Sequence, residues 1–353
     1  MLFQAARDVF SRRSFLSHPL RRRFNTAAGP ALNTSLRRSY LYVPTSSDRM
    51  LQKSLETTSD IVIYDLEDSV PPGTTDKERA RQRLKEFLTN KSADELPPPN
   101  RIAIRLNDIN TPFFKHDITE ALRIPSIRTL ILPKIHSAKD LHYVSREIYT
   151  SFQSESSRNP SESPLHIVAS IESARSVWNL GDIAAWKSEH GPELGGTLSA
   201  LLFASEDYCA DTSIIRTPSR QELLYTRSQI VVAAKTFGLS AIDMVCINYK
   251  DFDYLRDECE DGRRLGFNGK QAIHPAQVHI IQSTFVPTSK DILRAAKILH
   301  QMKVAHASQI GAFGLELEGG GKEMIDAPML KQAEKTIQIA RAAGIEIPDA
   351  AIA

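Results

Sequence analysis

Two short apolar segments in the middle of the chain each lead into acidic residues. The first segment, 166–171, precedes Glu172, and the second, 200–205, precedes Glu206 and Asp207. Both are apolar on their two alternating faces, which is typical of β-strands buried on both sides. A helix predicted between them makes the strands parallel, and neighbouring strands lie about 4.8 Å apart. The carboxylates of Glu172 and Asp207 could therefore bind one hard cation such as Mg²⁺.

These acids also fit a simpler interpretation. Asp and Glu are favoured at the start of a helix, where they accept hydrogen bonds from free N–H groups and oppose the helix dipole. For Glu172 or Asp207 taken alone, the helix cap explains the residue. Their occurrence at matching ends of two strands favours the metal site.

The alternation of strand and helix recurs along the chain and predicts the fold. Several stretches between the strand-like segments are amphipathic helices, and one carries an apolar stripe at 223, 224, 230, 231 and 234. Eight βα units within residues 39–288 predict an α/β protein, a (β/α)8 TIM barrel, with a doubly wound sheet as the alternative. The strand-like segments are 39–45, 61–68, 101–107, 129–135, 166–172, 200–207, 241–248 and 269–275.

Polar residues concentrate at the predicted C-terminal ends of these strands, where a TIM barrel builds its active site. Acids on the second, fifth and sixth strands, together with Arg105 and Lys134, predict a site for an anion and a metal ion. An internal network of salt bridges is the alternative, since buried charges must be paired. The polar residues at strand ends are Glu67, Asp68, Arg105, Asn107, Lys134, Glu172, Glu206, Asp207, Asn248 and His274.

Three basic residues are candidates for binding an anionic substrate. The forked guanidinium of Arg105 suits a carboxylate, because it forms two parallel hydrogen bonds. Arg49 and Lys53 are four residues apart at the start of the first predicted helix and share one face of it. They could hold phosphates, although from the pattern alone a solvated basic face is the default explanation.

Composition excludes several classes of protein. The 353-residue chain is 41% hydrophobic, and no apolar run reaches the roughly 18 residues of a membrane span. Cys209, Cys246 and Cys259 form no CxxC pair, which argues against a disulfide framework or a zinc site. The dinucleotide motif GxGxxG, the P-loop motif and the hydrolase motif GxSxG are absent from the sequence.

The first 38 residues differ from the rest of the chain. They contain eight Arg, no Lys and a single acid, Asp8, and they are rich in Ser and Ala. This composition predicts a mitochondrial presequence and hence a matrix location, with a disordered basic arm as the alternative. Without this segment 36 basic and 41 acidic residues remain, a net charge of −5, so we expect no nucleic-acid partner.

Residues 289–353 follow the predicted barrel as a helical extension. Two amphipathic stretches, 289–306 and 328–344, are predicted helices. Between them the segment 311–326 contains three consecutive glycines and ends at Asp326. We interpret this segment as a lid loop or a plain flexible connection.

Six segments taken together resemble one known family. The chain resembles the citrate lyase β-subunit-like group of the HpcH/HpaI aldolase superfamily over nearly all of residues 39–345. One difference follows the first strand, where the group usually has Pro-Gly-Asn and this chain has Pro-Thr-Ser at 44–46. The segments are YLYVP at 40–44, YDLEDSV at 64–70, IES at 171–173, SED at 205–207, GKQAIHP at 269–275 and MIDAP at 324–328.

The resemblance implies a role for each matching residue. Glu172 and Asp207 match the Mg²⁺ ligands, Arg105 matches a catalytic, substrate-binding arginine, and Asp326 matches a catalytic aspartate that acts in a neighbouring subunit. The acids expected beside the metal are Glu67 and Asp68. The residues that match contacts to the coenzyme A thioester are Tyr42, Arg49, Lys53, Ala272 and Ile273.

The activity implied by the resemblance is Mg²⁺-dependent cleavage of a carbon–carbon bond in an acyl-CoA. The expected reaction converts citramalyl-CoA to acetyl-CoA and pyruvate, with malate-synthase-like condensation as a side activity, in a homo-oligomer that is expected to be a trimer. A malyl-CoA-type lyase or thioesterase and a metal-dependent 2-oxo-acid aldolase without coenzyme A are alternatives. A non-enzymatic assembly subunit, as in citrate lyase complexes, is a further alternative.

Overall fold

The computed structural model describes residues 36–154, 164–307, 313–316 and 322–349 of the chain. All of them belong to one compact unit, residues 35–353. The predicted presequence, residues 1–38, lies outside the described residues except for its last three. It stays a prediction.

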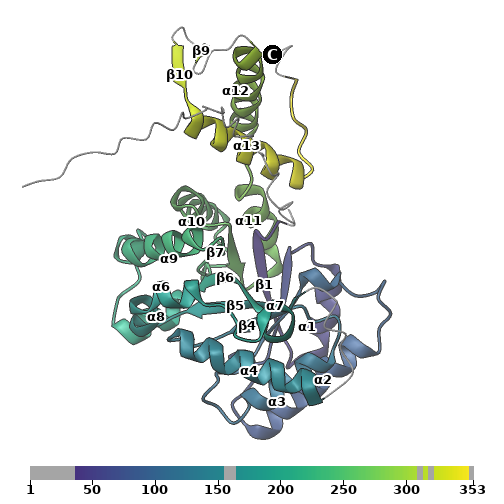
Figure 1. Ribbon diagram of the computed structural model, residues 1–353. Coiled ribbons are helices and arrows are strands. Elements are labelled where there is room, and N and C mark those ends of the chain that lie inside the picture. The colour runs from purple at the N-terminus through teal and green to yellow at the C-terminus, as the bar shows by residue number, and fades with distance from the viewer. Residues whose placement is uncertain (1–35, 155–163, 308–312, 317–321, 350–353) are drawn as a thin grey trace, which may run out of the picture. The chain divides into compact units, whose positions relative to one another are not determined.

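Eight parallel strands close into a barrel in which each strand pairs with its sequence neighbours and β8 pairs with β1 (Figure 1). The predicted TIM barrel is therefore confirmed, and the doubly wound sheet is wrong, because an open sheet would leave the pair β1–β8 unformed. The strands are β1 (Ser39–Pro44), β2 (Ile61–Asp65), β3 (Ile102–Arg105), β4 (Thr129–Leu132), β5 (His166–Ile171), β6 (Thr197–Phe203), β7 (Ser240–Asp243) and β8 (Gly269–Ala272).

The observed strands end one to five residues before the predicted ones. At these ends the chain leaves the sheet although its apolar and polar residues still alternate. The largest correction concerns β6, which begins at Thr197 rather than Ala200 and ends at Phe203. Glu206 and Asp207 consequently lie in the first turn of helix α8 (Ser205–Thr212), and not on the strand.

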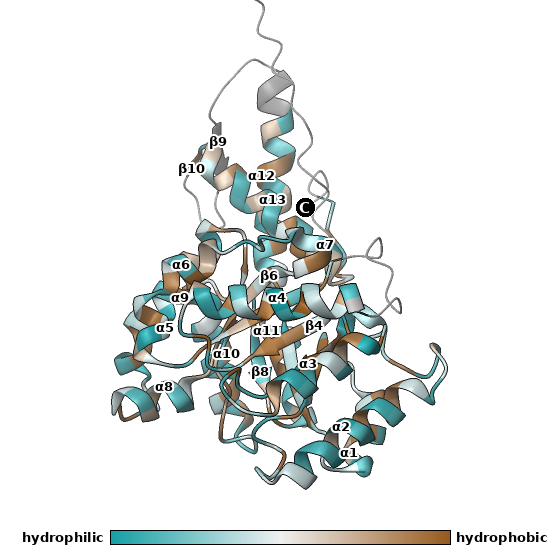
Figure 2. Cartoon of the chain, turned by 60° about the horizontal axis from the view of Figure 1, so that its bottom comes forward, coloured by the Kyte–Doolittle hydropathy of each residue, from teal (hydrophilic) through white to brown (hydrophobic). Residues whose placement is uncertain are grey.

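Side chains of alternating strand residues form two separate cores. One set fills the barrel interior and includes Tyr40, Ile63, Ala103, Val168 and Leu202, all fully buried. The other set faces outward and packs against the surrounding helices. Strands buried on both faces explain the continuous apolar segments, such as the brown β4 in Figure 2.

Helices follow the strands and cover the outside of the barrel (Figure 1). Gly266 ends α10 with a φ of 102°, a left-handed conformation that favours glycine at this position. The helices of the barrel are α1 (Asp48–Lys53), α2 (Thr74–Thr89), α3 (Phe114–Arg123), α4 (Ala138–Ser154), α5 (Ala174–Trp178), α6 (Leu180–Ala185), α7 (Gly191–Gly195), α8 (Ser205–Thr212), α9 (Leu224–Thr236), α10 (Phe252–Leu265) and α11 (Val278–Thr284). Four short 3₁₀ helices lie at Ser54–Glu56, Pro99–Arg101, Gln221–Leu223 and Pro275–Gln277.

The extension contains α12 (Ser289–Ala307), α13 (Ala327–Ala342) and an antiparallel hairpin of β9 (Phe313–Glu316) and β10 (Lys322–Ile325). Its own small core includes Ile292, Ile298 and Ile337. The two predicted helices are confirmed. The segment predicted as a loop instead contains strand pairing, and its glycines, Gly319–Gly321, lie outside the described residues.

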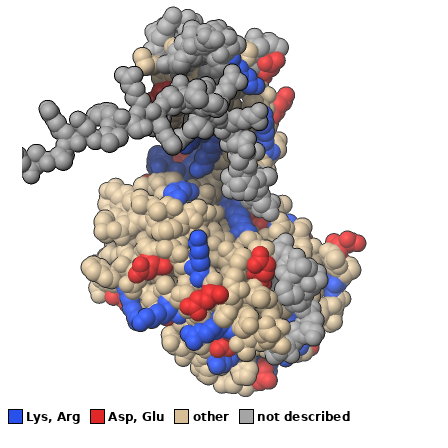
Figure 3. Space-filling model, in the orientation of Figure 1, with Lys and Arg blue, Asp and Glu red and all other residues tan. Residues whose placement is uncertain are grey.

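The surface of the barrel carries charges of both signs, and Figure 3 shows basic and acidic side chains interspersed over its lower part. No helix among the described residues combines the length and the apolar character needed to cross a membrane.

One ion pair between α9 and β7 is almost fully removed from water. Arg227 is 1% exposed, and its Nε and Nη2 bind the two carboxylate oxygens of Asp243, 0% exposed, at 3.1 and 2.7 Å. Its Nη1 binds Asp261 at 2.6 Å. Because two buried charges depend on each other, the loss of either leaves an uncompensated charge in the interior.

Replacement of Arg227 by Ala should therefore lower the free energy of unfolding by about 3–5 kcal/mol, the usual effect of breaking a buried pair. Urea unfolding followed by circular dichroism measures this change. Arg264→Ala is the matched control, since Arg264 is exposed and its distance to Glu260 is 3.7 Å. An exposed pair contributes less than about 1 kcal/mol, and equal losses in the two variants would contradict the prediction.

Candidate active site

The candidate site lies at the C-terminal ends of the barrel strands and is built by inward-facing residues. Side chains on a strand alternate between its faces, so the last inward residue of each strand faces the barrel mouth. On β2 this residue is Asp65, two positions after the interior Ile63, and on β3 it is Arg105, two after the interior Ala103. Asp65 and Arg105 are partners in the sheet register.

Arg105 is held by three carboxylates. Its Nε and Nη2 each lie 2.7 Å from an oxygen of Asp65, and its Nη1 lies 2.9 Å from both Glu67 and Asp68. The guanidinium carbon stands 4.8 Å from the centre of the Tyr42 ring. Asp65 and the other acids hold the pKa of Arg105 well above its usual value, although burial opposes this. The guanidinium that was predicted to bind a carboxylate of the substrate is thus bound to Asp65 through Nε and Nη2. Its third nitrogen, Nη1, lies beside Glu67 and Asp68.

Asp65 is a site residue that the sequence analysis missed. Its carboxylate also accepts hydrogen bonds from the backbone N–H groups of Glu67 (2.9 Å) and Ser69 (3.2 Å), so it orders the loop that carries two predicted acids. Burial raises the pKa of Asp65, but Arg105 and these donors outweigh burial, and the net shift is downward. Strand side chains alternate between two faces, so Asp65 is expected to face inward like Ile63, two residues earlier. This alternation is the sequence signal that could have identified Asp65.

Glu172 follows β5 and is held by two donors. Its Oε1 accepts a hydrogen bond from the backbone N–H of Lys134 at 2.7 Å, and its Oε2 accepts one from the hydroxyl of Ser170 at 2.6 Å. Lys134 adopts a φ of 51°, a left-handed conformation uncommon for a residue with a side chain. Such backbone strain is concentrated at functional sites, and here it directs an N–H group to the carboxylate.

Asp207, in the first turn of α8, is the second predicted metal ligand. Its negative charge acts on the carboxylate of Glu172, the first predicted ligand. Burial raises the pKa of Glu172, and the charge of Asp207 raises it further. Partial burial and the charge of Asp68 raise the pKa of Asp207 in turn.

Negative charge is in excess at this site, and the excess fits a bound cation. The pKa of Glu67 is raised to about 7, mainly by burial. The negative charges of Asp68 and Glu172 also raise this pKa, whereas the positive charges of Arg105 and Lys134 lower it. Lys134 Nζ reaches one oxygen of Glu67 at 3.3 Å. Five acids, Asp65, Glu67, Asp68, Glu172 and Asp207, thus face the two cations Arg105 and Lys134, and a divalent ion would offset most of the excess negative charge.

The donor set also fits Mg²⁺. Within the described ranges, no group of three or more His, Cys, Asp or Glu side chains is arranged around one metal position. Mg²⁺ keeps several waters and is usually bound by one or two carboxylates plus ligand oxygens. Glu172 and Asp207 would hold such an ion, with Glu67 and Asp68 near its waters.

Glu206 does not join the site, in contrast to what the sequence pattern predicts. Its carboxylate binds Nη1 of Arg216, in the segment after α8. Successive residues of a helix lie about 100° apart around its axis. The acids at 206 and 207 therefore serve different networks.

The residues expected to contact coenzyme A lie along β1, α1 and β8. The hydroxyl of Tyr42 donates to Oε1 of Gln271 at 2.9 Å inside the barrel. Arg49 and Lys53 are exposed, one turn apart on α1. Ala272, the last residue of β8, is buried, and Ile273 just after the strand is exposed and donates its N–H to Gln277 at 2.8 Å. Since β1 pairs with β8, these residues line adjacent strand ends.

Asp326 lies in the extension and not in the barrel. It is the N-cap of α13, where its Oδ1 accepts a hydrogen bond from the N–H of Met329 at 3.1 Å. The side chain is exposed. A helix cap alone explains this geometry, so its predicted catalytic role depends on a neighbouring subunit.

The Thr-Ser pair after β1 joins two loops of the site. Thr45 is fully buried, and its hydroxyl donates to the carbonyl of Asp65 at 2.6 Å. The hydroxyl of Ser46 donates to the carbonyl of Ser69 at 3.0 Å. A Gly-Asn pair would lack both hydroxyls, so these two connections between the β1–α1 loop and the acidic β2–α2 loop depend on Thr45 and Ser46.

Chemically, the arrangement combines a position for a divalent cation with a fixed guanidinium at the mouth of a barrel. Such a pair can hold a 2-oxo or 2-hydroxy acid through its oxygens and stabilise negative charge that develops on it. The exposed Arg49 and Lys53 add positive charge at the rim.

Comparison with known proteins places the chain among relatives of similar length. Residues 38–275 match the family model described as HpcH/HpaI aldolase/citrate lyase. The chain is 30% identical to the mitochondrial citramalyl-CoA lyase of Homo sapiens over 307 residues, 86% of this chain and 85% of that protein. It is 32% identical to the citrate lyase subunit beta-like protein of Deinococcus radiodurans, over 85% of this chain and 95% of that one.

The fold is also similar to that of solved structures. The protein CitE from Mycobacterium tuberculosis, in complex with magnesium, acetoacetate and coenzyme A, matches 88% of this chain and 99% of its own, with a TM-score of 0.65 and 26% identity. A citrate lyase from Burkholderia xenovorans matches 90% of this chain and 95% of its own with a TM-score of 0.73. At 20% identity the second likeness concerns the fold alone.

The loop connection through Thr45 can be tested by removing one hydroxyl. Thr45→Val keeps the side-chain shape, and loss of the bond to Asp65 should lower the free energy of unfolding by about 1 kcal/mol. It should also speed hydrogen exchange at the amides of Glu67 and Ser69, because these donate to the Asp65 carboxylate. Mass spectrometry of exchange in a peptide covering 61–72 measures this.

Thr45→Ser is the matched control, since it keeps the hydroxyl and should keep slow exchange. If exchange in Thr45→Val equalled that of the native protein, the hydroxyl would have no part in ordering the loop.

Proposed function

We infer the function from the family, because this chain belongs to the HpcH/HpaI aldolase/citrate lyase family. We propose that it is a Mg²⁺-dependent carbon–carbon lyase acting on an acyl-CoA. The observation that carries this proposal is the chain of contacts at the barrel mouth, in which Glu67 binds both Arg105 and Lys134 and the N–H of Lys134 holds Glu172. The magnesium and coenzyme A of the CitE complex support the same assignment of cofactor and substrate class.

The proposed substrate is citramalyl-CoA, and the products are acetyl-CoA and pyruvate. In this cleavage the hydroxyl group loses its proton, and the bond between the hydroxyl-bearing carbon and the adjacent methylene breaks. The electron pair of that bond passes to the thioester as an enolate, which takes a proton at carbon to give acetyl-CoA. The name of the human relative supports this choice of substrate.

Glu172 and Asp207 would hold the cation, which when bound supplies Lewis-acid polarisation of the acid's oxygens. Arg105 has Nη1 at the mouth, where it stabilises charge on the carboxylate or on the thioester oxygen. Asp65 keeps that guanidinium in place through two bonds of 2.7 Å. A fixed donor needs no reorganisation when charge develops, which is the source of its catalytic effect.

Asp326 is proposed to move the proton at the acetyl carbon of a substrate bound in a neighbouring subunit. Its place in the extension, exposed at the start of α13, supports a role outside its own barrel. The functional form would then be a homo-oligomer, which we propose is a trimer. Arg49, Lys53 and the strand end at Ala272 and Ile273 would contact the coenzyme A part of the substrate.

The proposed location is the mitochondrial matrix. The arginine-rich composition of residues 1–38 and the names of mammalian mitochondrial relatives support it. The proposed barrel domain spans 39–288 and the extension 289–353.

A second candidate is a subunit of a larger lyase assembly. Relatives named citrate lyase subunit beta, such as that of Leuconostoc mesenteroides at 29% identity, support this candidate. The two proposals differ in whether the chain turns over substrate alone.

The purified chain from residue 39 onward should release pyruvate from citramalyl-CoA in the presence of Mg²⁺. A lactate dehydrogenase assay follows the pyruvate through oxidation of NADH, and EDTA should abolish the signal. Asp207→Asn should lower kcat at least about 100-fold, since it removes one of two charged metal ligands. Free citramalate and coenzyme A without pyruvate would instead indicate a thioesterase, and no turnover with intact Mg²⁺ binding would favour the assembly subunit.

Sharing of the site between subunits can be tested by mixing two inactive variants. Asp207→Ala and Asp326→Ala protomers, unfolded together and refolded at equal amounts, should recover about a quarter of native activity if each site takes Asp326 from a neighbour. A shared site is active only when its own protomer retains Asp207 and the neighbouring protomer retains Asp326. Half of the protomers meet each condition, so about a quarter of the sites meet both. If each site used its own Asp326, the mixture would stay as inactive as either variant.

A further inference from the structure

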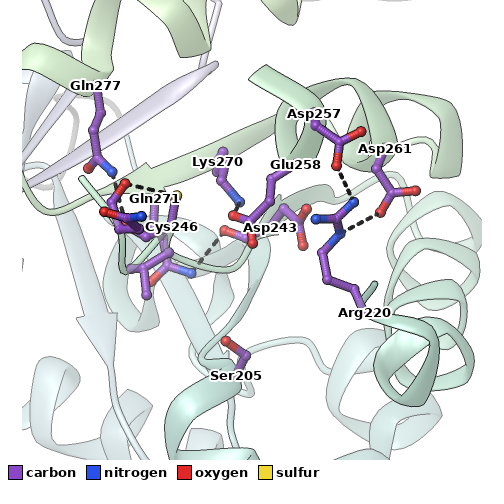
Figure 4. Close-up of polar contacts among 12 residues, drawn as sticks. Ser205, Arg220, Asp243, Cys246, Asp257, Glu258, Asp261, Lys270, Gln271 and Gln277 are labelled. Carbon is purple, nitrogen blue, oxygen red and sulfur yellow. Dashed lines mark hydrogen bonds and ion pairs between the residues drawn. The ribbon is translucent and has the colours of Figure 1, made fainter. Parts of the chain in front are cut away.

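A buried chain of charges connects the β7–β8 side of the barrel to the start of α8. Lys270 on β8 and Glu258 on α10 are both 0% exposed, and their charged groups lie 3.0 Å apart. The other oxygen of Glu258 binds Nη2 of Arg216 at 2.7 Å. Figure 4 shows Lys270 beside Glu258, with Ser205, the first residue of α8, in the same view.

Arg216 completes the chain at α8. Its Nη1 donates to the hydroxyl of Ser205 at 3.1 Å and to the carboxylate of Glu206. Its Nη2 also donates to the carbonyl of Val245, just after β7, at 3.0 Å. One guanidinium therefore joins the first turn of α8 to two other elements of the barrel.

The next residue of that turn is Asp207. Unlike Glu172, which accepts hydrogen bonds from two other residues, Asp207 accepts none from another residue's side chain among the described residues. The N-cap of α8, Ala204, offers no side-chain cap either. The place of the Asp207 carboxylate thus depends on how the turn itself is held.

Stability alone is a weak explanation for this network. Burying paired charges gains little, because desolvation offsets their attraction, and an apolar set of similar volume is often as stable. Burial raises the pKa of Glu258, but the positive charges of Lys270 and Arg216 outweigh burial and lower this pKa to about 2. Glu258 is therefore a fixed anion that keeps Arg216 in one orientation.

We propose that Arg216, held by Glu258 and Lys270, is the positioning residue that fixes Asp207 in the geometry for binding the divalent cation. This inference rests on the proposed function, because it assumes that Asp207 is a metal ligand. It goes beyond that function by assigning the position of one metal ligand to a buried network of α10 and β8 that contacts the preceding two residues of α8.

Direct binding of Mn²⁺, followed by electron paramagnetic resonance of the free ion, tests the proposal on the full-length protein without any turnover. Arg216→Gln should weaken Mn²⁺ binding about tenfold, the lower end of the effect of losing a group that hydrogen-bonds a metal ligand directly, because Arg216 acts on Asp207 through the helix turn. Arg220→Gln is the matched control, because Arg220 also pairs with acids of α10, Asp257 at 2.6 Å and Asp261 at 3.5 Å, but has no hydrogen bond or ion pair with α8 in the described part of the chain. Its Mn²⁺ affinity should stay within about twofold of native while its stability falls comparably.

A second variant approaches the same contact from α8. Ser205→Ala combined with Glu206→Ala removes the two side-chain acceptors that α8 offers to Arg216 and leaves Arg216, Glu258 and Lys270 paired. It should weaken Mn²⁺ binding about as much as Arg216→Gln, and it decides the question if Arg216→Gln does not fold.

Asp207→Asn separates failure of this inference from failure of the proposed function. If Asp207→Asn loses Mn²⁺ but both network variants bind it with native affinity, the positioning role is wrong and the metal site stands. If Asp207→Asn binds Mn²⁺ as the native protein does, the proposed metal site is wrong and the positioning role falls with it.

Discussion

The closure of eight parallel strands into a barrel is the constraint on which the rest of this structure depends. Closure brings eight strand ends to one mouth, and the two-residue period of side chains decides which residue of each strand faces it. The interior below the mouth is apolar, with Ile63, Ala103 and Val168 among its members. Charged residues at the mouth therefore lie close together beside an apolar interior that cannot solvate them.

The charges respond to this crowding in two ways. Asp65 and Arg105 pair through two bonds of 2.7 Å, and their pairing outweighs burial in setting the pKa of each. Glu67, Glu172 and Asp207 are less fully compensated, so burial and mutual repulsion raise their pKa values. The first set fixes the guanidinium of Arg105, and the second leaves an excess of negative charge that a divalent ion can offset.

Hydrogen bonds from outside the mouth give these groups their geometry. The backbone N–H of Lys134 and the hydroxyl of Ser170 fix Glu172, and the hydroxyl of Thr45 ties the loop after β1 to Asp65. Arg216 holds the first turn of α8 from the side of β7 and α10. The positions of side chains at the strand ends therefore depend on how rigidly the surrounding loops are held. In this protein hydrogen bonds from polar side chains connect those loops.

The sequence by itself determined the eight strands, the barrel and the concentration of acids at strand ends, because apolar segments of this length and spacing have few other ways to bury both faces. It also placed Glu172, Asp207 and Arg105 among the candidates. Only the tertiary structure decided where each strand ends. The predicted second strand continued to Asp68, which concealed Asp65 as its last residue, and the predicted sixth strand included Glu206, which instead lies in α8 and binds Arg216. Ion pairs between distant segments, such as Arg216 with Glu258, leave no local pattern, since their partners meet only when the barrel closes.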